Sequence, residues 1–512
     1  MELILLPLIR FLFGGLSMAS GRASRVLAIL ALVADAVLLG KLAFSLSTGV
    51  PPAIILGGWD RGLGIAFVGD RIGLTFAALT WGLAVAVVLY TWRDALRPYF
   101  FVLLHLLIGA SYALVLTKDL FNAYVILELL TLASFLLVGY GRRPRQIWAS
   151  LRYLILCSLG MSLFLFGVAV IYYHTRSLNL ADVAAQVSID PTAAWVRLAA
   201  ALLVGGVAVK AGVFLFSLWL PAAHARAIPA VSALLSGVVI KMGVVVLFRL
   251  SEVFSLGLTL TVLGFATGFL GILYAVQTYD LKRLLAFSTL SQIGYLLIGL
   301  GVGSEAARLG IIDYAVAHGL FKGLLFLAVG EAARTVGTSD LRALILNRSA
   351  IPKATRAALI VGVLGIIGMP PFAGFAAKAV LESALHPTLF HAAVGLLSVG
   401  TTVSFAKLMP LLFADSSGQT DRLRAVSYGW LGGAVVLFLP LSAAIVPRSL
   451  HTACLGWPAI LEAVAAILLG LGLHRLIRNR PFRLPQSVFR IEEGTLVILA
   501  GFFLIYVLLL IG

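Results

Sequence analysis

The sequence has few cysteines and few charged residues for its length. Of 512 residues, two are cysteine (Cys157 and Cys454) and 12% are charged, about half of the roughly 25% usual in soluble proteins. Two cysteines so far apart cannot form a disulfide framework or a cysteine-based metal site. The chain also has no CxxC pair, no glycine-rich phosphate-binding loop and no His/Cys cluster. We therefore expect no cofactor and no metal in this chain.

Hydrophobic residues instead make up 61% of the chain. They form repeated apolar runs of about 20 residues, the length that crosses a bilayer as a helix. The pattern predicts an all-α polytopic membrane protein. The first 15 residues lack the basic start and cleavage site of a signal peptide, so we expect them to be the first span. About 16 spans begin near residues 3, 26, 72, 98, 119, 147, 195, 228, 256, 283, 306, 357, 388, 427, 456 and 493.

The formal net charge of +17 would suggest nucleic acid as the partner of a soluble protein, but the placement of the charge favours a membrane. Loops after odd-numbered spans hold 22 Arg and Lys, whereas loops after even-numbered spans hold eight. The positive-inside rule then puts the basic loops in the cytoplasm and both termini outside the cell (inner) membrane. We therefore expect the chain to lie in a lipid bilayer and to bind no nucleic acid.

Eight basic residues remain inside the spans, and six of them are lysine, although the chain has only nine lysines. Lysine can lose its proton when desolvated, whereas arginine effectively cannot. Four lysines and one acid lie near mid-span, and such residues are functional candidates by default. The alternative is a buried ion pair that only fixes helix packing. These five candidates are Glu128, Lys210, Lys241, Lys322 and Lys378.

Six other charged residues inside spans have simpler explanations. Arg152 lies one turn from the cytoplasmic end of its span, and we expect it to be structural. Lys41 and Lys407 could lie near enough to span ends to reach the headgroups. Arg10 could sit against a partner or a headgroup. Asp35 and Glu462 are single acids that could serve as polar helix contacts.

Two spans are predicted to be interrupted next to a lysine. Lys210 is followed by a hinge with two prolines, and Pro370 and Pro371 precede Lys378, where a helix cannot continue. Matching interruptions in two halves are typical of inverted-repeat transporters with a site at the bilayer midplane. Between the halves, His318 and Lys322 are four residues apart and so share a helix face. Two basic groups this close cannot comfortably both be charged, which favours proton exchange.

This reasoning divides the chain into four parts. They are N-terminal spans 1–3 (1–96), a first repeat of spans 4–8 (97–250), a second repeat of spans 9–13 (251–413) and C-terminal spans 14–16 (414–512).

Five segments resemble, in order and spacing, the antiporter-like subunits of respiratory complex I. They look closest to the D-subunit branch of Mrp-type cation/proton antiporters and its relatives in membrane-bound hydrogenases. The resemblance covers roughly residues 70–415. The segments are DLFNAYVILELLTLASFLL, KAGVFLFSLWLPAAHARAIPAVSALLSGVVIKMG, YDLKRLLAFSTLSQIGYLLIGLG, HGLFKGLLFLAVG and GMPPFAGFAAK.

The resemblance implies a 14-helix antiporter-like core with two inverted five-helix repeats and broken helices 7 and 12, here followed by about two extra C-terminal spans. It implies a proton route along the membrane midplane and function only with other membrane subunits. In that pattern Glu128 pairs with Lys210, Lys241 is the next relay group, His318 and Lys322 bridge the halves, and Lys378 is the terminal lysine. Lys407 falls where the D-subunit branch often has a basic residue.

The hinge departs from the family pattern. The family commonly reads LPDAHAEA, whereas this chain reads LPAAHARA, so that Ala222 and Arg226 replace two acids. His224 is therefore only a tentative proton entry.

Three functions stay open at this point. The first is an Mrp-type D subunit of a cation/proton antiporter. The second is the pumping subunit of an NADH:quinone oxidoreductase or a membrane-bound hydrogenase. The third is a proton-driven partner in inorganic-carbon uptake. In the second case it would belong to an oxidoreductase while holding no redox site itself. Sodium could pass through the complex, but we expect no sodium site on this chain because it lacks an oxygen-rich acidic cluster.

Overall fold

The computed structural model describes residues 1–18, 21–59, 64–217, 219–385, 388–413, 418–437, 456–477 and 491–511. Cys454 and most of the basic loop before the last span lie outside these residues. Helices dominate the described part, and twelve are long and apolar enough to cross a membrane. They are α2 (Gly21–Ser47), α3 (Arg71–Thr91), α4 (Pro98–Leu116), α5 (Leu120–Val138), α6 (Pro144–Thr175), α8 (Ala194–Ala211), the α10–α11 helix (Pro229–Ser251, made of α10, Pro229–Leu234, and α11, Ile240–Ser251, with the turn between them), α12 (Gly257–Gln277), α13 (Leu281–Val302), α14 (Glu305–Val336), α23 (Trp457–Ile477) and α24 (Ile491–Ile511).

Each of the sixteen predicted spans begins inside or close to an observed helix. The four that fall outside the twelve are shorter or interrupted: α1 (Glu2–Leu16), α16 (Lys353–Ile367), α18 (Thr388–Ala406) and α20 (Arg422–Val436). Short helices join them: α7 (Leu180–Val187), α9 (Leu220–Arg226), α15 (Leu341–Leu346), α17 (Ala373–Ser383) and α19 (Met409–Leu412). The prediction of an all-α polytopic membrane protein is confirmed.

The chain forms two compact units. Unit 1 comprises Met1–Trp219, Val238–Thr259 and Phe489–Gly512, and unit 2 comprises Leu220–Gly237 and Leu260–Val488. One boundary falls within the α10–α11 helix, whose middle turn, Leu235–Val239, is π-helical. A π-helical turn inside an α-helix is frequently found at functional sites.

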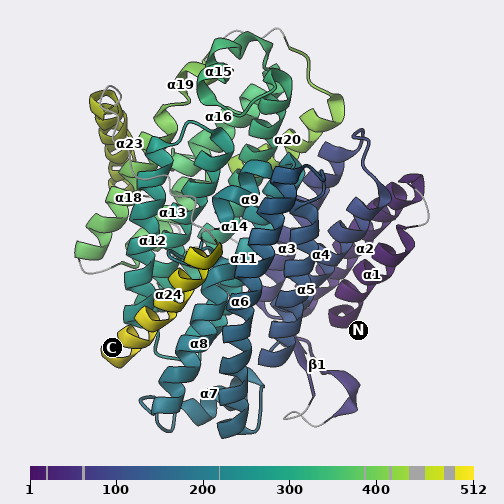
Figure 1. Ribbon diagram of the computed structural model, residues 1–512, viewed down its shortest axis with the longest axis vertical. Coiled ribbons are helices and arrows are strands. Elements are labelled where there is room, and N and C mark those ends of the chain that lie inside the picture. Colours follow the sequence, from purple (N-terminus) through teal and green to yellow (C-terminus); the bar gives the residue numbers. More distant parts are fainter. Residues whose placement is uncertain are drawn as a thin grey trace. The chain divides into compact units, whose positions relative to one another are not determined.

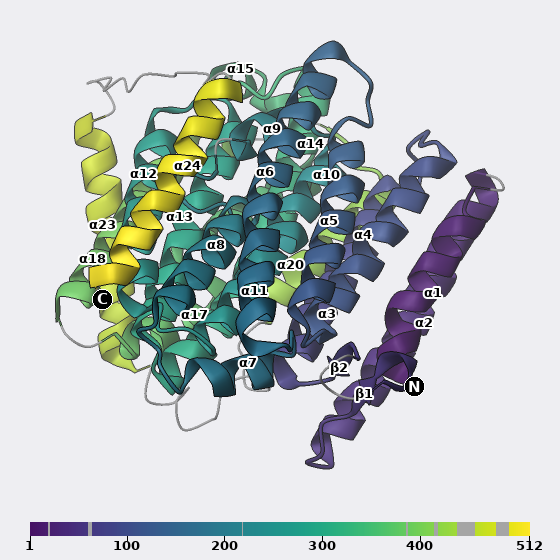
Figure 2. The same cartoon turned by 60° about the horizontal axis from the view of Figure 1, so that its bottom comes forward.

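In unit 1, α1 packs against α2 and α4, and α6 packs along α8. Figures 1 and 2 show α1 beside α2. Glycine permits the second contact, because a Cβ on Gly206 would lie 2.6 Å from the carbonyl oxygen of Gly160 on α6. A two-stranded antiparallel hairpin of β1 (Ala53–Ile55) and β2 (Ala66–Val68) completes this unit.

In unit 2, the 32-residue helix α14 is almost wholly buried and contacts α13, α16, α17 and α20. Helix α18 packs against α23, which lies beside it in Figures 1 and 2. A Cβ on Gly470 of α23 would lie 2.6 Å from Cβ of Thr402, so glycine lets these two helices approach closely.

Both predicted interruptions are confirmed. Helix α8 ends at Ala211, Gly212 adopts a left-handed φ of 71°, and α9 starts at Leu220. Helix α16 ends at Ile367, Gly368 has φ 82°, and α17 starts at Ala373. Left-handed backbone is where glycine is favoured, so each break begins at a residue suited to end a helix.

Candidate functional site

Lys210 lies in the last turn of α8, directly before the first break. Its side chain is buried, and Nζ donates to the backbone carbonyl of Leu127 on α5 at 3.3 Å. Glu128 is the next residue on α5 and interacts electrostatically with Lys210. One of its carboxylate oxygens, Oε1, is buried without a hydrogen-bond partner. The structure thus brings the two residues together without showing a hydrogen bond between their side chains.

Helix α6 adds two groups beside Lys210 that the sequence analysis did not select. Tyr153 and Cys157 are fully buried and four residues apart, so they share one face of α6. The Cys157 thiol interacts electrostatically with Lys210, and Tyr153 packs on Trp219 with ring centroids 4.4 Å apart. Trp219 in turn donates to the carbonyl of Val209 at 2.8 Å. Tyr153 and Cys157 are four residues apart in an otherwise apolar helix, and this spacing is the sequence signal that could have identified both.

Lys241 lies in α11 and is fully buried. Helix α11 approaches the end of α8 so closely that a Cβ on Gly243 would lie 2.6 Å from the backbone nitrogen of Ala211. Lys210 and Lys241 thus lie on neighbouring helices of unit 1, next to their point of closest approach.

His224 lies in the short helix α9 of unit 2 and is completely buried. Its ring stacks on Phe326 of α14 at a centroid distance of 4.5 Å. Both ring nitrogens lack a hydrogen-bond partner among the described residues. Burial, followed by the charges of Lys322 and Lys282, lowers the pKa of His224 to about 3. The imidazole is therefore neutral at physiological pH.

His318 and Lys322 lie one turn apart on α14, and both are fully buried. Lys322 Nζ donates to the carbonyl of Leu285 at 2.8 Å and to the hydroxyl of Ser288 at 2.5 Å, both on α13. Both acceptors lie on α13, and further polar side chains follow on the same helix.

A row of polar side chains on α13 leads from Lys322 towards Lys378. Gln292 is one turn beyond Ser288; it accepts a hydrogen bond from Tyr314 and donates to Thr401 at 3.2 Å. Tyr295 is one turn further, and its hydroxyl lies 2.9 Å from that of Ser398 on α18. We call Ser288, Gln292, Tyr295, Tyr314, Ser398 and Thr401 the polar row.

Lys378 ends this row, in the second turn of α17 and 5% exposed. Its Nζ lies 3.4 Å from the hydroxyl of Ser398 and 3.4 Å from the carbonyl of Ile366, in the last turn of α16. The face of the Tyr295 ring is 5.2 Å from the ammonium. Hydroxyl and amide side chains therefore lie at successive turns of α13 and on its neighbours between Lys322 and Lys378 within unit 2.

Lys407 has a different environment. It follows the last residue of α18, and Nζ donates to three backbone carbonyls at the end of α12, those of Ala275, Val276 and Thr278, each at 2.8 Å. The last carbonyls of a helix have no partner within it. Lys407 thus caps α12.

Arg10 and Asp35 form a buried ion pair between α1 and α2. Arg10 Nε donates to Asp35 Oδ2 at 2.8 Å, Nη2 donates to the same oxygen, and Tyr112 donates to it at 2.7 Å. His105 lies 3.4 Å from Arg10. Each residue thus has its partner inside the same unit, as a helix contact. Lys41, in contrast, is exposed on α2.

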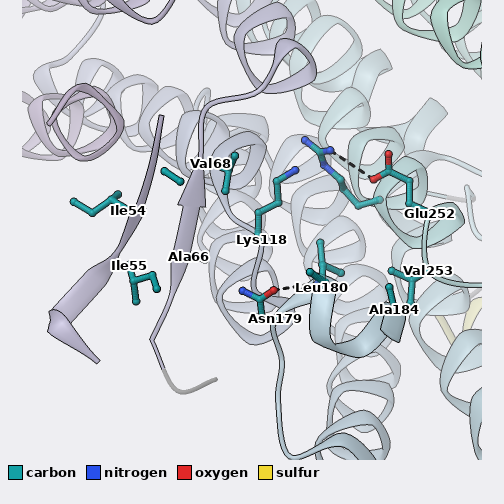
Figure 3. A pocket seen from close by; sticks show the side chains of 13 residues that line it. Ile54, Ile55, Ala66, Val68, Lys118, Asn179, Leu180, Ala184, Glu252 and Val253 are labelled. Carbon is teal, nitrogen blue, oxygen red and sulfur yellow. Dashed lines mark hydrogen bonds and ion pairs between the residues drawn. The ribbon is translucent and has the colours of Figure 1, made fainter. Parts of the chain in front are cut away.

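A cavity of about 680 Å³ lies between the β-hairpin and the ends of α7 and α11 in unit 1 (Figure 3). Its walls are apolar apart from a few groups that include Lys118, Arg249 and Glu252. Asp70 pairs with Lys118 at 2.7 Å and with Arg249, which also contacts Glu252 at 3.6 Å. Burial alone would raise the pKa of Asp70, but the two cations more than offset this and hold its pKa below its ordinary value. The charges at this cavity are therefore paired.

Comparison with known proteins identifies the family of these helices. The family described as the membrane domain of NADH:quinone oxidoreductase and Mrp antiporters matches residues 117–404. That range holds Glu128, Lys210, Lys322, Lys378 and the polar row. The chain belongs to this family.

Two curated relatives come from different branches of the family. The D subunit of the Na⁺/H⁺ antiporter of Alkalihalophilus pseudofirmus is 30% identical over 70% of this chain and 75% of that protein. The N subunit of the NADH-quinone oxidoreductase of Desulforudis audaxviator is 33% identical over 66% of this chain and 70% of that protein.

Two solved structures share the fold. A chain of an archaeal membrane-bound sulfane sulfur reductase aligns with TM-score 0.79 at 24% identity, covering 92% of this chain and 99% of that one. A chain of the Mrp complex from a Dietzia species aligns with TM-score 0.75 at 24% identity, covering 95% of this chain and 58% of that one. The predicted resemblance to antiporter-like subunits is confirmed.

Proposed function

We propose that this chain is a proton-translocating, antiporter-like subunit of a larger membrane complex, of the Mrp D-subunit type. The observation that carries the proposal is the polar row, which lies between two buried lysines of unit 2, Lys322 and Lys378. A row of polar residues that only stabilised the fold would not need a group able to gain and lose a proton at each end.

The route has one segment in each unit. In unit 1, Glu128 holds the proton on Lys210, and a partner subunit that moves or changes charge loosens this interaction, so that Lys210 passes the proton to Lys241. In unit 2, Lys322 with His318 receives the proton and the polar row holds the water that carries it to Lys378. The order of the groups is the one that the family pattern implies. His224, neutral and buried, is the proposed entry group.

The four lysines share a property that suits this role. Each side chain is buried, and the hydrogen bonds given above for Lys210, Lys322 and Lys378 go to carbonyls and hydroxyls. These dipoles stabilise the protonated form, and at Lys210 the nearby Glu128 adds to this stabilisation.

We further propose that the protein lies in the cell (inner) membrane with both termini outside, and that 97–250 and 251–413 form inverted repeats. The partners are other membrane subunits of the same complex. The 30% identity to an antiporter D subunit favours the Mrp type. The 33% identity to a quinone oxidoreductase N subunit supports the second candidate, the pumping subunit of a redox complex. Purification of the native complex decides between them, because iron–sulfur subunits would co-purify only with the second.

The test of proton translocation uses the native complex in proteoliposomes, with proton movement followed by a pH-sensitive dye. Glu128→Gln and Lys378→Met should each abolish coupled transport while leaving the other subunits bound. Lys41→Met is the matched control, because Lys41 is an exposed lysine on α2, and it should transport at the wild-type rate. Wild-type transport in either of the first two variants would refute the proposal.

A further inference from the structure

The proposed route leaves one step open, namely how a proton leaves Lys378. Glu382 lies four residues after Lys378 on α17, so the two side chains lie on the same helix face. The two groups interact electrostatically. Glu382 is only partly buried, whereas Lys378 is 5% exposed. Glu382 is therefore one turn closer to the end of its helix and to solvent.

His391 lies next to Glu382. It lies in the first turn of α18, and its Nδ1 is 3.4 Å from the backbone carbonyl of Glu382. The other ring nitrogen, Nε2, is 3.3 Å from Oε2 of Glu462 on α23. The His391 side chain is 39% exposed and that of Glu462 is 58% exposed. Exposure thus rises at each step from Lys378 to Glu462.

These residues come from three helices whose placement follows from the sequence. Glu382 is at the end of predicted span 12, His391 is at the start of span 13, and Glu462 is near the start of span 15. The positive-inside rule puts all three of these span ends on the outer side. Their contact in unit 2 agrees with that assignment.

We propose that Glu382, His391 and Glu462 form the outer proton exit from Lys378, and that the C-terminal helix α23 supplies the last group of this path. The inference rests on the proposed function. It also gives a role to α23, which lies beyond the part of the chain that the family matches.

The proton balance is simple. Charged Lys378 gives its proton to the Glu382 carboxylate, leaving a neutral amine and a carboxylic acid. The acid passes the proton through water to the His391 imidazole, and Glu462 stabilises the imidazolium before the proton goes to bulk water. No electrons move. Imidazole suits the middle position because its two nitrogens can face different partners. Among the described residues, the titratable groups that interact with it are Glu382 from α17 and Glu462 from α23.

The experiment measures proton transport by the native complex in proteoliposomes over a range of outer pH. Glu382→Gln and His391→Ala should lower the rate by roughly a hundredfold, the lower end of what a positioned proton-transfer group contributes. Imidazole buffer added on the outer side should restore transport to His391→Ala. Glu305→Gln is the matched control, because Glu305 is an exposed acid at the predicted outer end of α14.

Glu462 is tested with two variants. Glu462→Gln should lower the rate and change the outer pH profile, whereas Glu462→Asp, which keeps the carboxylate, should retain most transport. Equal loss in both variants would mean that α23 only packs against α18, and would overturn the proposal. Wild-type rates in Glu382→Gln and His391→Ala, combined with no transport in Lys378→Met, would also overturn it while leaving the proposed function intact. If Lys378→Met transports normally, the proposed function itself fails.

Discussion

The buried pair of Arg10 and Asp35 permits a prediction whose size follows from its contacts. Both side chains are at most 1% exposed, and Asp35 Oδ2 accepts from Arg10 twice and from Tyr112 once. Asp35→Ala removes this acceptor and leaves a buried guanidinium without a counter-ion, with His105 at 3.4 Å and the Tyr112 hydroxyl as neutral neighbours. Removing one partner of a buried ion pair costs about 3–5 kcal/mol, a large part of the roughly 5–15 kcal/mol that stabilises a typical domain.

The assay is thermal unfolding of the purified protein in detergent. A loss of this size should lower the melting temperature by roughly 10 °C in a unit of this length. Asp35→Asn keeps an oxygen acceptor but loses the charge, so it should fall between wild type and Asp35→Ala.

The double variant Arg10→Met/Asp35→Leu is the control. Replacing both partners with apolar side chains removes the unpaired charge and should recover most of the loss, because apolar replacement of a buried ion pair is often neutral. A wild-type melting temperature for Asp35→Ala would refute the assignment. If the double variant melts no higher than Asp35→Ala, packing rather than charge accounts for the effect.

Three further predictions concern single residues. Gln292→Leu interrupts the polar row and should lower proton transport roughly tenfold or more with the lysines intact, whereas Gln186→Leu at an exposed position of α7 should have no effect. Lys407→Met removes the cap of α12 and should cost about 1–3 kcal/mol, seen as a lower melting temperature. Lys407→Arg should keep both stability and transport; loss of transport in that variant would instead indicate proton release from Lys407, which arginine cannot provide. The depressed pKa of His224, about 3 in the fold against 6.5 for the free side chain, means that the unfolded chain binds the additional proton, so stability should fall as pH drops from about 6.5 towards 3. In His224→Gln the melting temperature should depend less on pH over this window, and an unchanged dependence would contradict the assignment.

The sequence predicts the helices and the buried lysines well, because each depends on a strong local signal. Long apolar runs locate the spans, and Lys210, Lys241, Lys322 and Lys378 differ from every residue around them. The breaks were predictable too, since proline or glycine stands at both. These features need no knowledge of which helices touch.

Pairing between helices is what the sequence does not reveal. Arg10 and Asp35 are 25 residues apart on different helices. Nothing in the sequence around either residue predicts that the two form a pair. Gln292 and Tyr295 are ordinary polar residues in an apolar span, and only packing against α14 and α18 makes them part of a row. Glu382 was not selected, although its spacing from Lys378 is helical. The signal existed there, but an acid near a span end has many simpler explanations.

The two broken helices and their lysines have a common physical reason. Lys210 lies in the last turn of α8, and Lys378 points its ammonium at the last turn of α16. The carbonyls of a final turn lack partners within the helix and carry the negative end of its dipole. A break inside the membrane therefore adds stabilisation for an ammonium beyond what a neighbouring carboxylate supplies. Burial without such stabilisation favours the neutral lysine, and a tight ion pair favours the charged one. An interrupted helix beside a lysine lets small changes in neighbouring charge decide whether the proton stays, which is the property that a coupled proton route needs.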